Sequence, residues 1–280
     1  MKNKYDVAVA YRIYPKTSQT PFIYANNKYK LAEVCLISFR NSLIGCKAKI
    51  WVILDGCPPS YKKMFLKYFN KKDLVFVEKQ GIGNHATFNL QLEILKRQKD
   101  SDIVYFAEDD YVYRENEFVK MINCLKKSEK IDFISPYDHL DLYNHDFNKG
   151  SFRISSSDNH HWRESPSTCL TFLTKKSSLL KAESQLKTYA RGNTDLSMWA
   201  GITKHKAFAF FDFLNHFFIL DLFYCKIFYD IWKYSLFFII FKRKMNLVTP
   251  IPSIATHAEK FYLAPNINWL DIVKVIKIKK

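Results

Sequence analysis

The sequence has 280 residues, of which 48% are hydrophobic and 25% charged, with seven glycines and nine prolines. This composition excludes a disordered chain and is typical of one large globular domain with added elements. The formal net charge of +16 favours an anionic partner such as nucleic acid, anionic lipid or a phosphorylated small molecule, although a lysine-rich surface explains it equally well.

Short apolar runs alternate with helical patterns over the first 110 residues. Runs at residues 7–10, 50–54, 74–77 and 103–107 are typical of buried strands, and apolar residues recur at helical spacing between them. This alternation predicts an α/β fold with a mostly parallel sheet flanked by helices. Ligands of such sheets bind outside the carboxyl ends of the strands, and acidic residues follow two of these runs.

A polar stretch follows the fourth run. Residues 137–164 are rich in Asp, Asn, His and Ser, and a regular apolar pattern resumes at residues 167–173. We therefore expect residues 137–164 to form a loop on the substrate side of the sheet.

The segment from residue 207 to residue 241 contains 11 phenylalanines, together with Tyr, Trp, Ile and Leu. Charged residues interrupt it every few positions, so no stretch reaches the roughly 18 to 20 uncharged residues of a membrane-spanning helix. The pattern predicts amphipathic helices that lie on a membrane or against a partner, and residues 242–244 (Lys-Arg-Lys) would then meet anionic headgroups. An ordinary buried helical hairpin is the alternative.

These patterns divide the chain into three parts. We expect a main α/β domain at residues 1–206, a membrane-associating helical segment at residues 207–245, and a part that completes the main domain at residues 246–280. The six cysteines form no CxxC pair and no cluster with zinc spacing, which favours reduced thiols. The N-terminal residues show no apolar targeting region, so we expect a cytoplasmic location.

Glu108, Asp109 and Asp110 form the most informative motif, at the end of the fourth predicted strand. Three adjacent carboxylates repel one another unless a cation or basic groups lie nearby. A divalent cation held by one or two carboxylates can neutralise a diphosphate leaving group. The motif therefore indicates a metal and diphosphate site, and a solvated acidic turn is the alternative.

The surroundings of this motif resemble a known family. Residues 83–90 (GNHATFNL), a predicted helix, and residues 102–110 (DIVYFAEDD) are similar in order and spacing to the family 2 glycosyltransferases and related GT-A-fold enzymes. In those enzymes a Gly-rich turn and a helix precede a strand that ends in an acidic motif. The resemblance covers about residues 5–205 and the region of His257. It implies a GT-A (Rossmann-like) fold and sugar transfer from a nucleotide diphosphate donor.

The resemblance also implies roles for individual residues. Asp195 corresponds to the catalytic base, with Thr194 in place of a preceding acid, although a helix-capping aspartate is an equally good local explanation. The expected metal ligands, for Mn²⁺ or Mg²⁺ with manganese preferred, are Glu108, Asp110 and His257. A surface histidine is the alternative for the last of these. The expected donor-binding residues are Asp55, Arg12, Asn84, Asn89 and Asp109.

The acceptor side is less well defined by sequence. Residues 160–164 (His-His-Trp-Arg-Glu) could stack on a sugar and pair with a phosphate, so we take them as candidate acceptor contacts. No Gln-x-x-Arg-Trp element is present, which argues against processive polymer synthesis. The resulting expectation is an inverting enzyme at the inner face of the membrane that adds one sugar to a lipid-linked or cell-surface glycan precursor.

Two other functions fit parts of the sequence. A nucleotidyltransferase would also use a parallel sheet and a carboxylate-bound Mg²⁺, but the segment after the first predicted strand has no Gly-rich basic signature. A basic nucleic-acid-binding protein would explain the charge and the 16% aromatic content. No recognised nucleic-acid motif occurs, so we expect no nucleic-acid partner.

Overall fold

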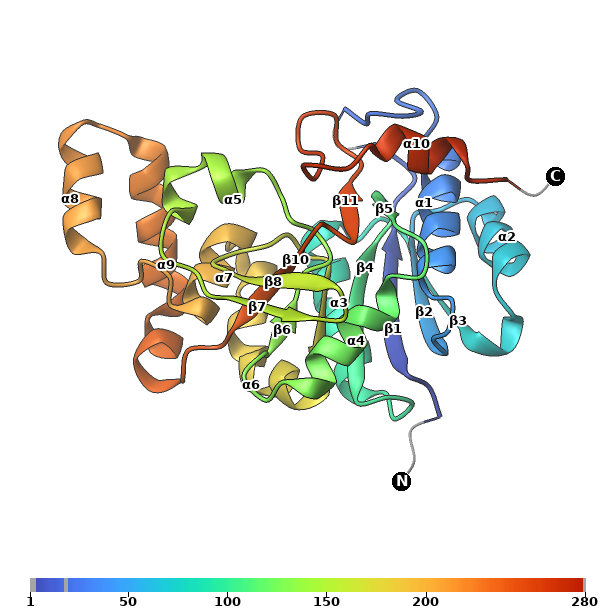
Figure 1. Ribbon diagram of the computed structural model, residues 1–280, viewed down its shortest axis with the longest axis horizontal. Helices are drawn as coiled ribbons and strands as arrows, with labels where there is room; N and C mark the ends of the chain where they lie inside the picture. The colour runs from blue at the N-terminus through green and yellow to red at the C-terminus, as the bar shows by residue number, and fades with distance from the viewer. Residues whose placement is uncertain (1–3, 18–19, 279–280) are drawn as a thin grey trace.

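The structure is a computed structural model that describes residues 4–17 and 20–278. Within these residues, a central sheet of nine strands lies between two layers of helices, and a two-stranded sheet stands beyond the carboxyl end of its strand β4 (Ile103–Glu108) (Figure 1). This arrangement confirms the predicted α/β architecture of a sheet flanked by helices.

The central sheet has the strand order β3-β2-β1-β4-β9-β6-β10-β8-β7. Strands β3, β2, β1 and β4 are parallel, whereas β9 and β8 are antiparallel to both of their neighbours. The other seven of the nine described strands point the same way, so the sheet is mostly parallel, as predicted. The strands are β1 (Val7–Ile13), β2 (Ala48–Asp55), β3 (Leu74–Lys79), β4 (Ile103–Glu108), β6 (Phe133–Ile134), β7 (Ile154–Ser157), β8 (His160–Ser165), β9 (Phe172–Lys175) and β10 (Leu247–Ile251).

A second, small sheet pairs β5 (Tyr111–Tyr113) with β11 (Ala255–His257) in antiparallel fashion. The helices are α1 (Lys28–Ser42), α2 (Pro59–Tyr68), α3 (Asn84–Arg97), α4 (Phe118–Lys127), α5 (Asp141–Asn144), α6 (Lys176–Leu186), α7 (Asp195–Thr203), α8 (Phe210–Phe218), α9 (Leu222–Phe241) and α10 (Trp269–Lys274). Short 3-10 turns occupy Lys71–Asp73, Asp146–Asn148 and Tyr189–Arg191.

Strand β1 shows why the predicted strands are apolar without alternation. Val7, Val9 and Tyr11 pack in a core with α1, α2 and α4 on one face of the sheet. Ala8 and Ala10 pack in a second core with α3, α6 and α7 on the other face. Because both faces are covered, every position of the strand is buried.

The loop predicted for residues 137–164 is wrong in part. This stretch contains α5, the Asp146–Asn148 turn and the antiparallel pair of β7 and β8. Strand β7 is an edge strand with three exposed residues, and its sequence Ile-Ser-Ser-Ser lacks the apolar pattern of a strand. The backbone pairing with β8, rather than side-chain burial, therefore determines its conformation.

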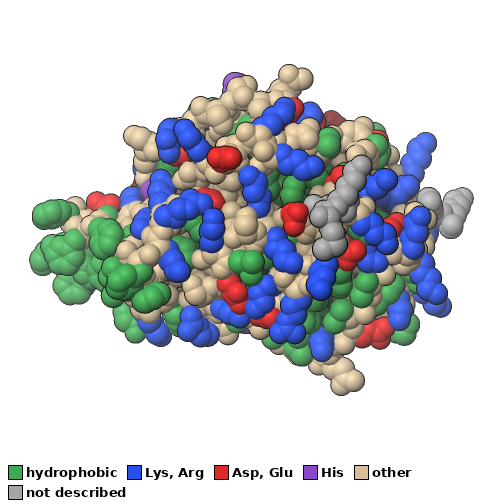
Figure 2. Space-filling view, turned by 90° about the horizontal axis from the view of Figure 1, so that it is seen from below, with side chains coloured by type: hydrophobic (Ala, Val, Ile, Leu, Met, Phe, Trp, Pro, Cys, Tyr) green, Lys and Arg blue, Asp and Glu red, His purple; other side chains and the backbone are tan. Residues whose placement is uncertain are grey.

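Helices α8 and α9 form a hairpin that projects from one end of the molecule (Figure 1). The inner side of α9 packs against α7, where a Cβ atom on Gly201 would overlap the Ser235 side chain. Large apolar side chains cover the outer side and gather at this end of the surface (Figure 2). The exposed ones are Phe208, Phe210, Phe211, Phe217, Phe218, Ile219, Leu220, Leu222, Phe223, Tyr229, Leu236, Phe237, Ile240 and Phe241.

The hairpin is therefore not fully buried, because one side packs on the protein and the other is exposed, and membrane association of residues 207–245 stays a prediction. Over residues 4–17 and 20–278, none of the helices combines the length and the apolar character needed to cross a bilayer.

Candidate active site

A cleft of about 690 Å³ opens at the carboxyl ends of the parallel strands, between the central sheet and α9. Five of the residues singled out from the sequence line this cleft, although they lie far apart in the chain. They are Asn84, Glu108, Asp110, Asp195 and His257. The other four predicted residues, Arg12, Asp55, Asn89 and Asp109, lie behind or beside its wall.

Asp110 and His257 meet because β5 and β11 pair. The register places His257 opposite Tyr111, the residue that follows Asp110. The Nε2 atom of His257 lies 3.1 Å from Oδ2 of Asp110. Oδ1 of Asp110 is buried and has no hydrogen-bond partner within the described part of the chain. The pair therefore offers one nitrogen and an unsatisfied carboxylate oxygen to the cleft.

The charges of this pair stabilise each other. Burial alone would raise the pKa of Asp110, but the charge and hydrogen bond of His257 outweigh burial and hold that pKa well below its usual range. Burial alone would lower the pKa of His257, but Asp110 raises it to about 9. Without a cation, a proton on the imidazole supplies the positive charge that the carboxylate requires.

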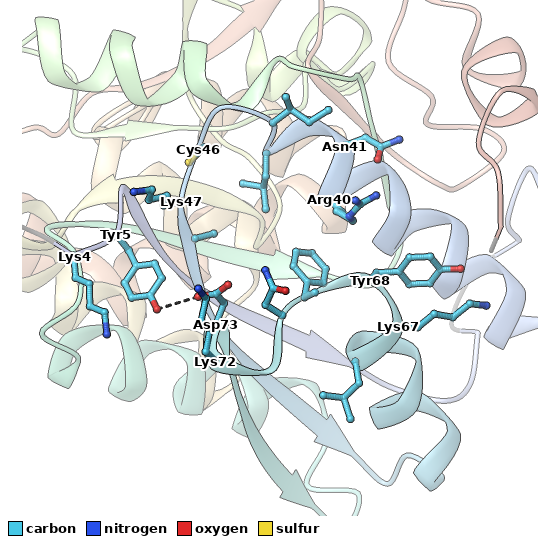
Figure 3. Close-up of a pocket in the computed structure, with 16 residues that line it drawn as sticks. Lys4, Tyr5, Arg40, Asn41, Cys46, Lys47, Lys67, Tyr68, Lys72 and Asp73 are labelled. Carbon is cyan, nitrogen blue, oxygen red and sulfur yellow. Dashed lines mark hydrogen bonds between the residues drawn. The ribbon is translucent and has the colours of Figure 1, made fainter. Parts of the chain in front are cut away.

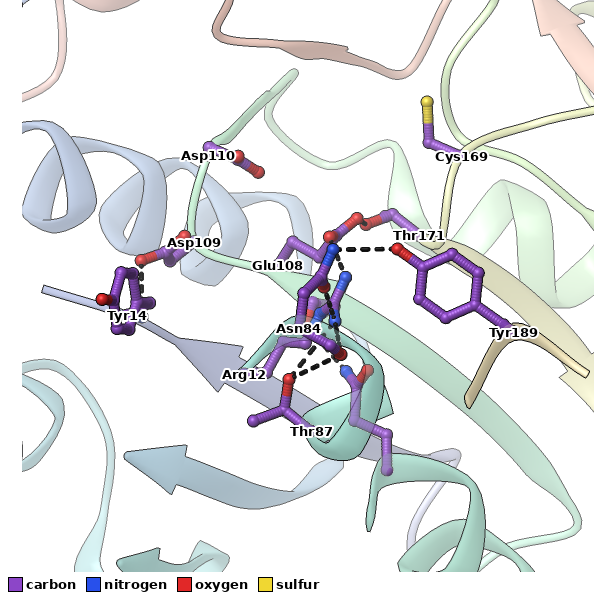
Figure 4. Close-up of polar contacts among 12 residues, drawn as sticks. Arg12, Tyr14, Asn84, Thr87, Glu108, Asp109, Asp110, Cys169, Thr171 and Tyr189 are labelled. Carbon is purple, nitrogen blue, oxygen red and sulfur yellow. Dashed lines mark hydrogen bonds and ion pairs between the residues drawn. The ribbon is translucent and has the colours of Figure 1, made fainter. Parts of the chain in front are cut away.

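Arg12 holds the wall of the cleft together from behind (Figure 4). Its guanidinium pairs with Glu108 and donates to the main-chain oxygen of Asn84 at 2.9 Å. The second carboxylate oxygen of Glu108 accepts from Thr171 Oγ1 at 2.9 Å. The side-chain amide of Asn84 donates to the Tyr189 hydroxyl at 2.8 Å. Both oxygens of Glu108 are thus engaged by the protein.

Asp109 points away from Asp110, toward the start of α1. Its Oδ2 atom lies 2.9 Å from Lys28 Nζ and accepts from the backbone N–H of Tyr14 at 3.2 Å. Burial raises the pKa of Asp109 to about 6, although Lys28 opposes this shift. The repulsion expected among the three adjacent acids is therefore reduced by three different cationic partners, namely Arg12, Lys28 and His257.

Asp55 stabilises the turn that leads into α3. Its two carboxylate oxygens accept from the backbone N–H groups of Ile82 at 2.7 Å and Gly83 at 2.9 Å. Gly83 has a φ of +84°, a conformation that favours glycine. Asp55 thereby fixes the start of the helix that carries Asn84. Asn89 lies further along α3, half-buried and outside the set of described residues that line the cleft.

Asp195 is the first residue of α7, and Thr194 provides the helix cap, since its Oγ1 accepts from the N–H of Ser197 at 3.3 Å. The capping role considered for Asp195 therefore belongs to its neighbour. Asp195 accepts a hydrogen bond from the N–H of Leu196 and lines the cleft. Burial raises its pKa, and the charge of Glu108 adds to the shift. A raised carboxylate pKa suits a group that exchanges a proton with a substrate.

Residues 160–164 do not contribute to the cleft. They belong to β8, between β10 and β7, where the Trp162 indole donates to Ser157 O and Arg163 pairs with Asp138. The described residues that line the cleft include none of them. Their interpretation as acceptor contacts in this cleft is therefore wrong, because the strand holds them in the sheet.

Sequence reasoning missed the residues that complete the cleft. Asp141 and His139 come from the stretch predicted as a loop, and Lys226 and Asp230 come from α9. Asp230 gave only a weak signal. From sequence, the only visible signal was an acid four residues after Lys226 inside an aromatic segment; in the structure Asp230 is 5% exposed and pairs with Lys226 at 2.6 Å.

The cleft fits a divalent cation only if a substrate supplies further ligands. No group of three or more His, Cys, Asp or Glu side chains is placed to hold a metal ion within residues 4–17 and 20–278. Asp110 and His257 nevertheless provide the oxygen and nitrogen donors that Mn²⁺ accepts. Such cations are commonly bound by one or two carboxylates together with substrate phosphates. Glu108, held by Arg12 and Thr171, is less free to bind a metal directly.

A second cavity, of about 850 Å³, lies at the amino ends of β2 and β3 (Figure 3). Arg40 and Lys67 line it, in the last turns of α1 and α2. The carboxyl ends of helices carry partial negative charge, which basic side chains balance. The positive charges of Arg40 and Lys67 are therefore explained by the helix ends that they balance. The cavity lies at the amino ends of the strands, whereas the acidic motif lies at their carboxyl ends.

The sequence matches no protein-family model and no curated protein. Distant similarity to solved structures is found. A cytidylyltransferase from Leptospira borgpetersenii serovar Hardjo-bovis (strain JB197) has 11% identity and a TM-score of 0.37 over 64% of each chain. The galactosyltransferase LgtC, in complex with donor and acceptor sugar analogues, has 10% identity and a TM-score of 0.40 over 70% of this chain and 69% of that one.

A 4-diphosphocytidyl-2C-methyl-D-erythritol synthase from Anaerococcus prevotii DSM 20548 has 13% identity and a TM-score of 0.40 over 69% of this chain and 82% of that one. The chain spans 64% of the length of the cytidylyltransferase. At this distance, the functional argument rests on the geometry of the cleft.

Proposed function

We propose that this chain is a glycosyltransferase that uses a divalent cation to move a sugar from a nucleotide diphosphate donor to a glycan or lipid-linked acceptor. The observation that carries the proposal is the convergence of Asn84, Glu108, Asp110, Asp195 and His257 on one cleft at the carboxyl ends of parallel strands. In α/β sheets of this kind, nucleotide ligands bind at that edge.

Asp110 and His257 are the proposed ligands of Mn²⁺ or Mg²⁺, and Glu108 is a third ligand through water. Support comes from the free Oδ1 atom of Asp110 and from the partly exposed side chains of the pair, at 24% and 20%. A bound cation neutralises the charge of the departing diphosphate.

The donor lies on the side of α3 and the start of α1 in this proposal. Asn84 presents its side chain to the cleft from the first turn of α3, whose amino end favours a phosphate group. Asp109 faces the same side, next to Lys28. Arg12 and Asp55 act by positioning Glu108 and the turn before α3, and Asn89 remains a candidate for contact with the nucleotide.

Asp195 is the proposed base. It accepts the proton of an acceptor hydroxyl while that oxygen forms a bond to the anomeric carbon. The bond between this carbon and the diphosphate oxygen breaks, and the nucleotide diphosphate leaves with the electron pair. Attack from the face opposite the leaving group inverts the configuration. The burial that raises the pKa of Asp195 makes it a stronger base than an exposed aspartate.

The proposal also includes an anionic membrane surface as a partner and a cytoplasmic location at the inner face of the membrane. The exposed apolar side chains of α8 and α9 support the membrane contact, as do Lys242 and Lys244 directly after α9, whereas Arg243 between them pairs with Asp132. An enzyme held at this surface would act on a precursor of a cell-surface polysaccharide.

Substitution of Asp110 by Asn tests the metal role. Thermal shift with nucleotide sugars should show stabilisation that depends on Mn²⁺ in the wild type, because a ligand bound to the folded state raises its stability. Asp110→Asn should lose this dependence and transfer activity. Asp158→Asn is the matched control, since Asp158 has a similar side-chain exposure of 20% and pairs with Lys127 elsewhere. Unchanged manganese-dependent affinity in Asp110→Asn would remove the metal role.

The products separate this function from its alternatives. A glycosyltransferase releases a nucleoside diphosphate from a nucleotide sugar and attaches the sugar to an acceptor. A nucleotidyltransferase would instead consume a nucleoside triphosphate with a sugar phosphate and release diphosphate. Salt-dependent binding to any duplex, without turnover of nucleotide sugars, would favour a nucleic-acid-binding protein.

A further inference from the structure

Helix α9 forms part of two surfaces at once. Phe223, Lys226, Ile227 and Asp230 recur at helical spacing near its start, and they line the cleft opposite the sheet. Further along the same helix, other positions expose large apolar side chains, including Phe237 at 66%. The wall of the cleft and the apolar surface of the hairpin are therefore parts of one rigid element.

The apolar surface is largest on α8 and on the turn that joins it to α9. Phe211 is 81% exposed and Phe218 is 77% exposed, and no described side chain covers either of them. Figure 2 shows these hydrophobic side chains together at one end of the molecule, while lysine and arginine side chains are spread over much of the visible surface. This combination matches the interior and the anionic headgroups of a lipid bilayer.

The cleft has the opposite charge from the rest of the protein. Six carboxylate side chains line it. Among its described lining residues, Lys226 pairs with Asp230 at 2.6 Å and His257 pairs with Asp110 at 3.1 Å. Asp141 and Asp195 stand on the side of α5 and α7, away from the proposed donor, whereas the charge of Asp230 on α9 is balanced by Lys226. Carboxylates accept hydrogen bonds from sugar hydroxyls and repel other anions.

We propose that the acceptor is a glycolipid of the bilayer on which the hairpin rests, and that the sugar it presents carries no acidic group. This inference rests on the proposed glycosyl transfer and adds to it the class of acceptor. The hairpin holds the mouth of the cleft at the membrane surface, and the carboxylates of α5 and α7 select a neutral sugar over an acidic one.

The first test compares one sugar in two settings. Transfer is measured to glucosyl- and galactosyl-diacylglycerol in vesicles of equal parts phosphatidylcholine and phosphatidylglycerol, and to the methyl glycosides of the same sugars in solution. Confinement to one surface raises effective concentration, so we expect kcat/KM to be higher on vesicles by on the order of 10²-fold. Transfer to methyl glycosides that is as fast as transfer on vesicles would overturn the inference and leave the proposed function intact.

Surface variants distinguish a loss of membrane binding from a loss of the fold. A double variant with Phe211→Ser and Phe218→Ser should lose the higher kcat/KM on vesicles. Its kcat/KM for methyl glycosides should be unchanged, because both side chains lie outside the cleft. Val275→Ser is the matched control, since Val275 is 74% exposed but follows α10. A double variant that keeps the higher kcat/KM on vesicles would refute the role of the hairpin in membrane binding. Absence of sugar transfer and of nucleotide-sugar hydrolysis by the wild type in both settings would instead refute the proposed function.

A third comparison addresses the charge of the acceptor. Glucuronosyl-diacylglycerol differs from glucosyl-diacylglycerol by a carboxylate, and we expect it to be the poorer acceptor. Asp141→Asn removes one charge of the cleft wall, so it should reduce the difference in transfer rate between the two glycolipids. Asp158→Asn should leave that difference unchanged. Equal or faster transfer to the acidic glycolipid by the wild type would contradict the selection proposed for the carboxylates.

Discussion

Replacement of Arg12 by Met tests whether this residue holds the cleft wall. Its side chain is 8% exposed and pairs with Glu108, which is 18% exposed. Removal of one partner from a buried ion pair costs about 3–5 kcal/mol. Glu108 keeps its hydrogen bond from Thr171, so we expect the lower end of this range, about 3 kcal/mol. For a chain of this size, that loss lowers Tm by roughly 6–12 °C.

The cause of this loss is best isolated with a double-mutant cycle. Free energies of unfolding are measured by urea denaturation for the wild type, Arg12→Met, Glu108→Gln and the double variant. Glu108→Gln removes the charge that Arg12→Met would leave unpaired, so the double variant should be more stable than the sum of the single effects by about 2 kcal/mol. Additive effects, or a loss below about 1 kcal/mol in Arg12→Met, would show that the pair does not support the wall.

Three further predictions concern α7 and the turn before α3. Because burial raises the pKa of Asp195, the transfer rate should rise with pH through a value above the usual ~3.9 of aspartate. Asp195→Asn should lose transfer yet be at least as stable at neutral pH, since a raised pKa disfavours the ionised folded state there; retained transfer would identify another base. Gly201→Ala should destabilise the fold by about 1–3 kcal/mol in urea, and Ser235→Gly should restore part of this, because the new Cβ meets both Oγ and Cβ of Ser235. Asp55→Ala should leave two N–H groups without acceptors and cost about 1–3 kcal/mol, and an unchanged unfolding midpoint would disprove that role.

The parallel half of the sheet was predictable because its strands are buried on both faces. Their apolar runs are therefore continuous, and the acidic motif follows directly at a strand end. Asp195 and His257 were also found, but only through resemblance to a family. The pairing of β5 with β11, which joins His257 to Asp110, depends on a long-range backbone contact that leaves no local pattern.

Two other parts of the structure, strand β7 and the cleft-lining face of α9, were not predictable, for different physical reasons. Strand β7 is held by backbone pairing at an exposed edge, so its side chains carry no periodic signal. In α9, aromatic residues lie on the buried side, on the exposed side and in the cleft. The position of Asp230 in the cleft wall therefore emerges only when the helix is packed on α7.

The short ladder between β5 and β11 has a consequence for how the protein reaches its active state. It ties the residue after Asp110 to His257, and the whole of the hairpin lies between them in the chain. Closing so long a loop is entropically costly, and such contacts form late in folding. The proposed metal site would therefore be among the last parts to assemble, after α8 and α9 have been synthesised. A ribosome-bound or truncated chain would have an acidic motif without its histidine, which would couple assembly of the proposed site to completion of the hairpin of α8 and α9.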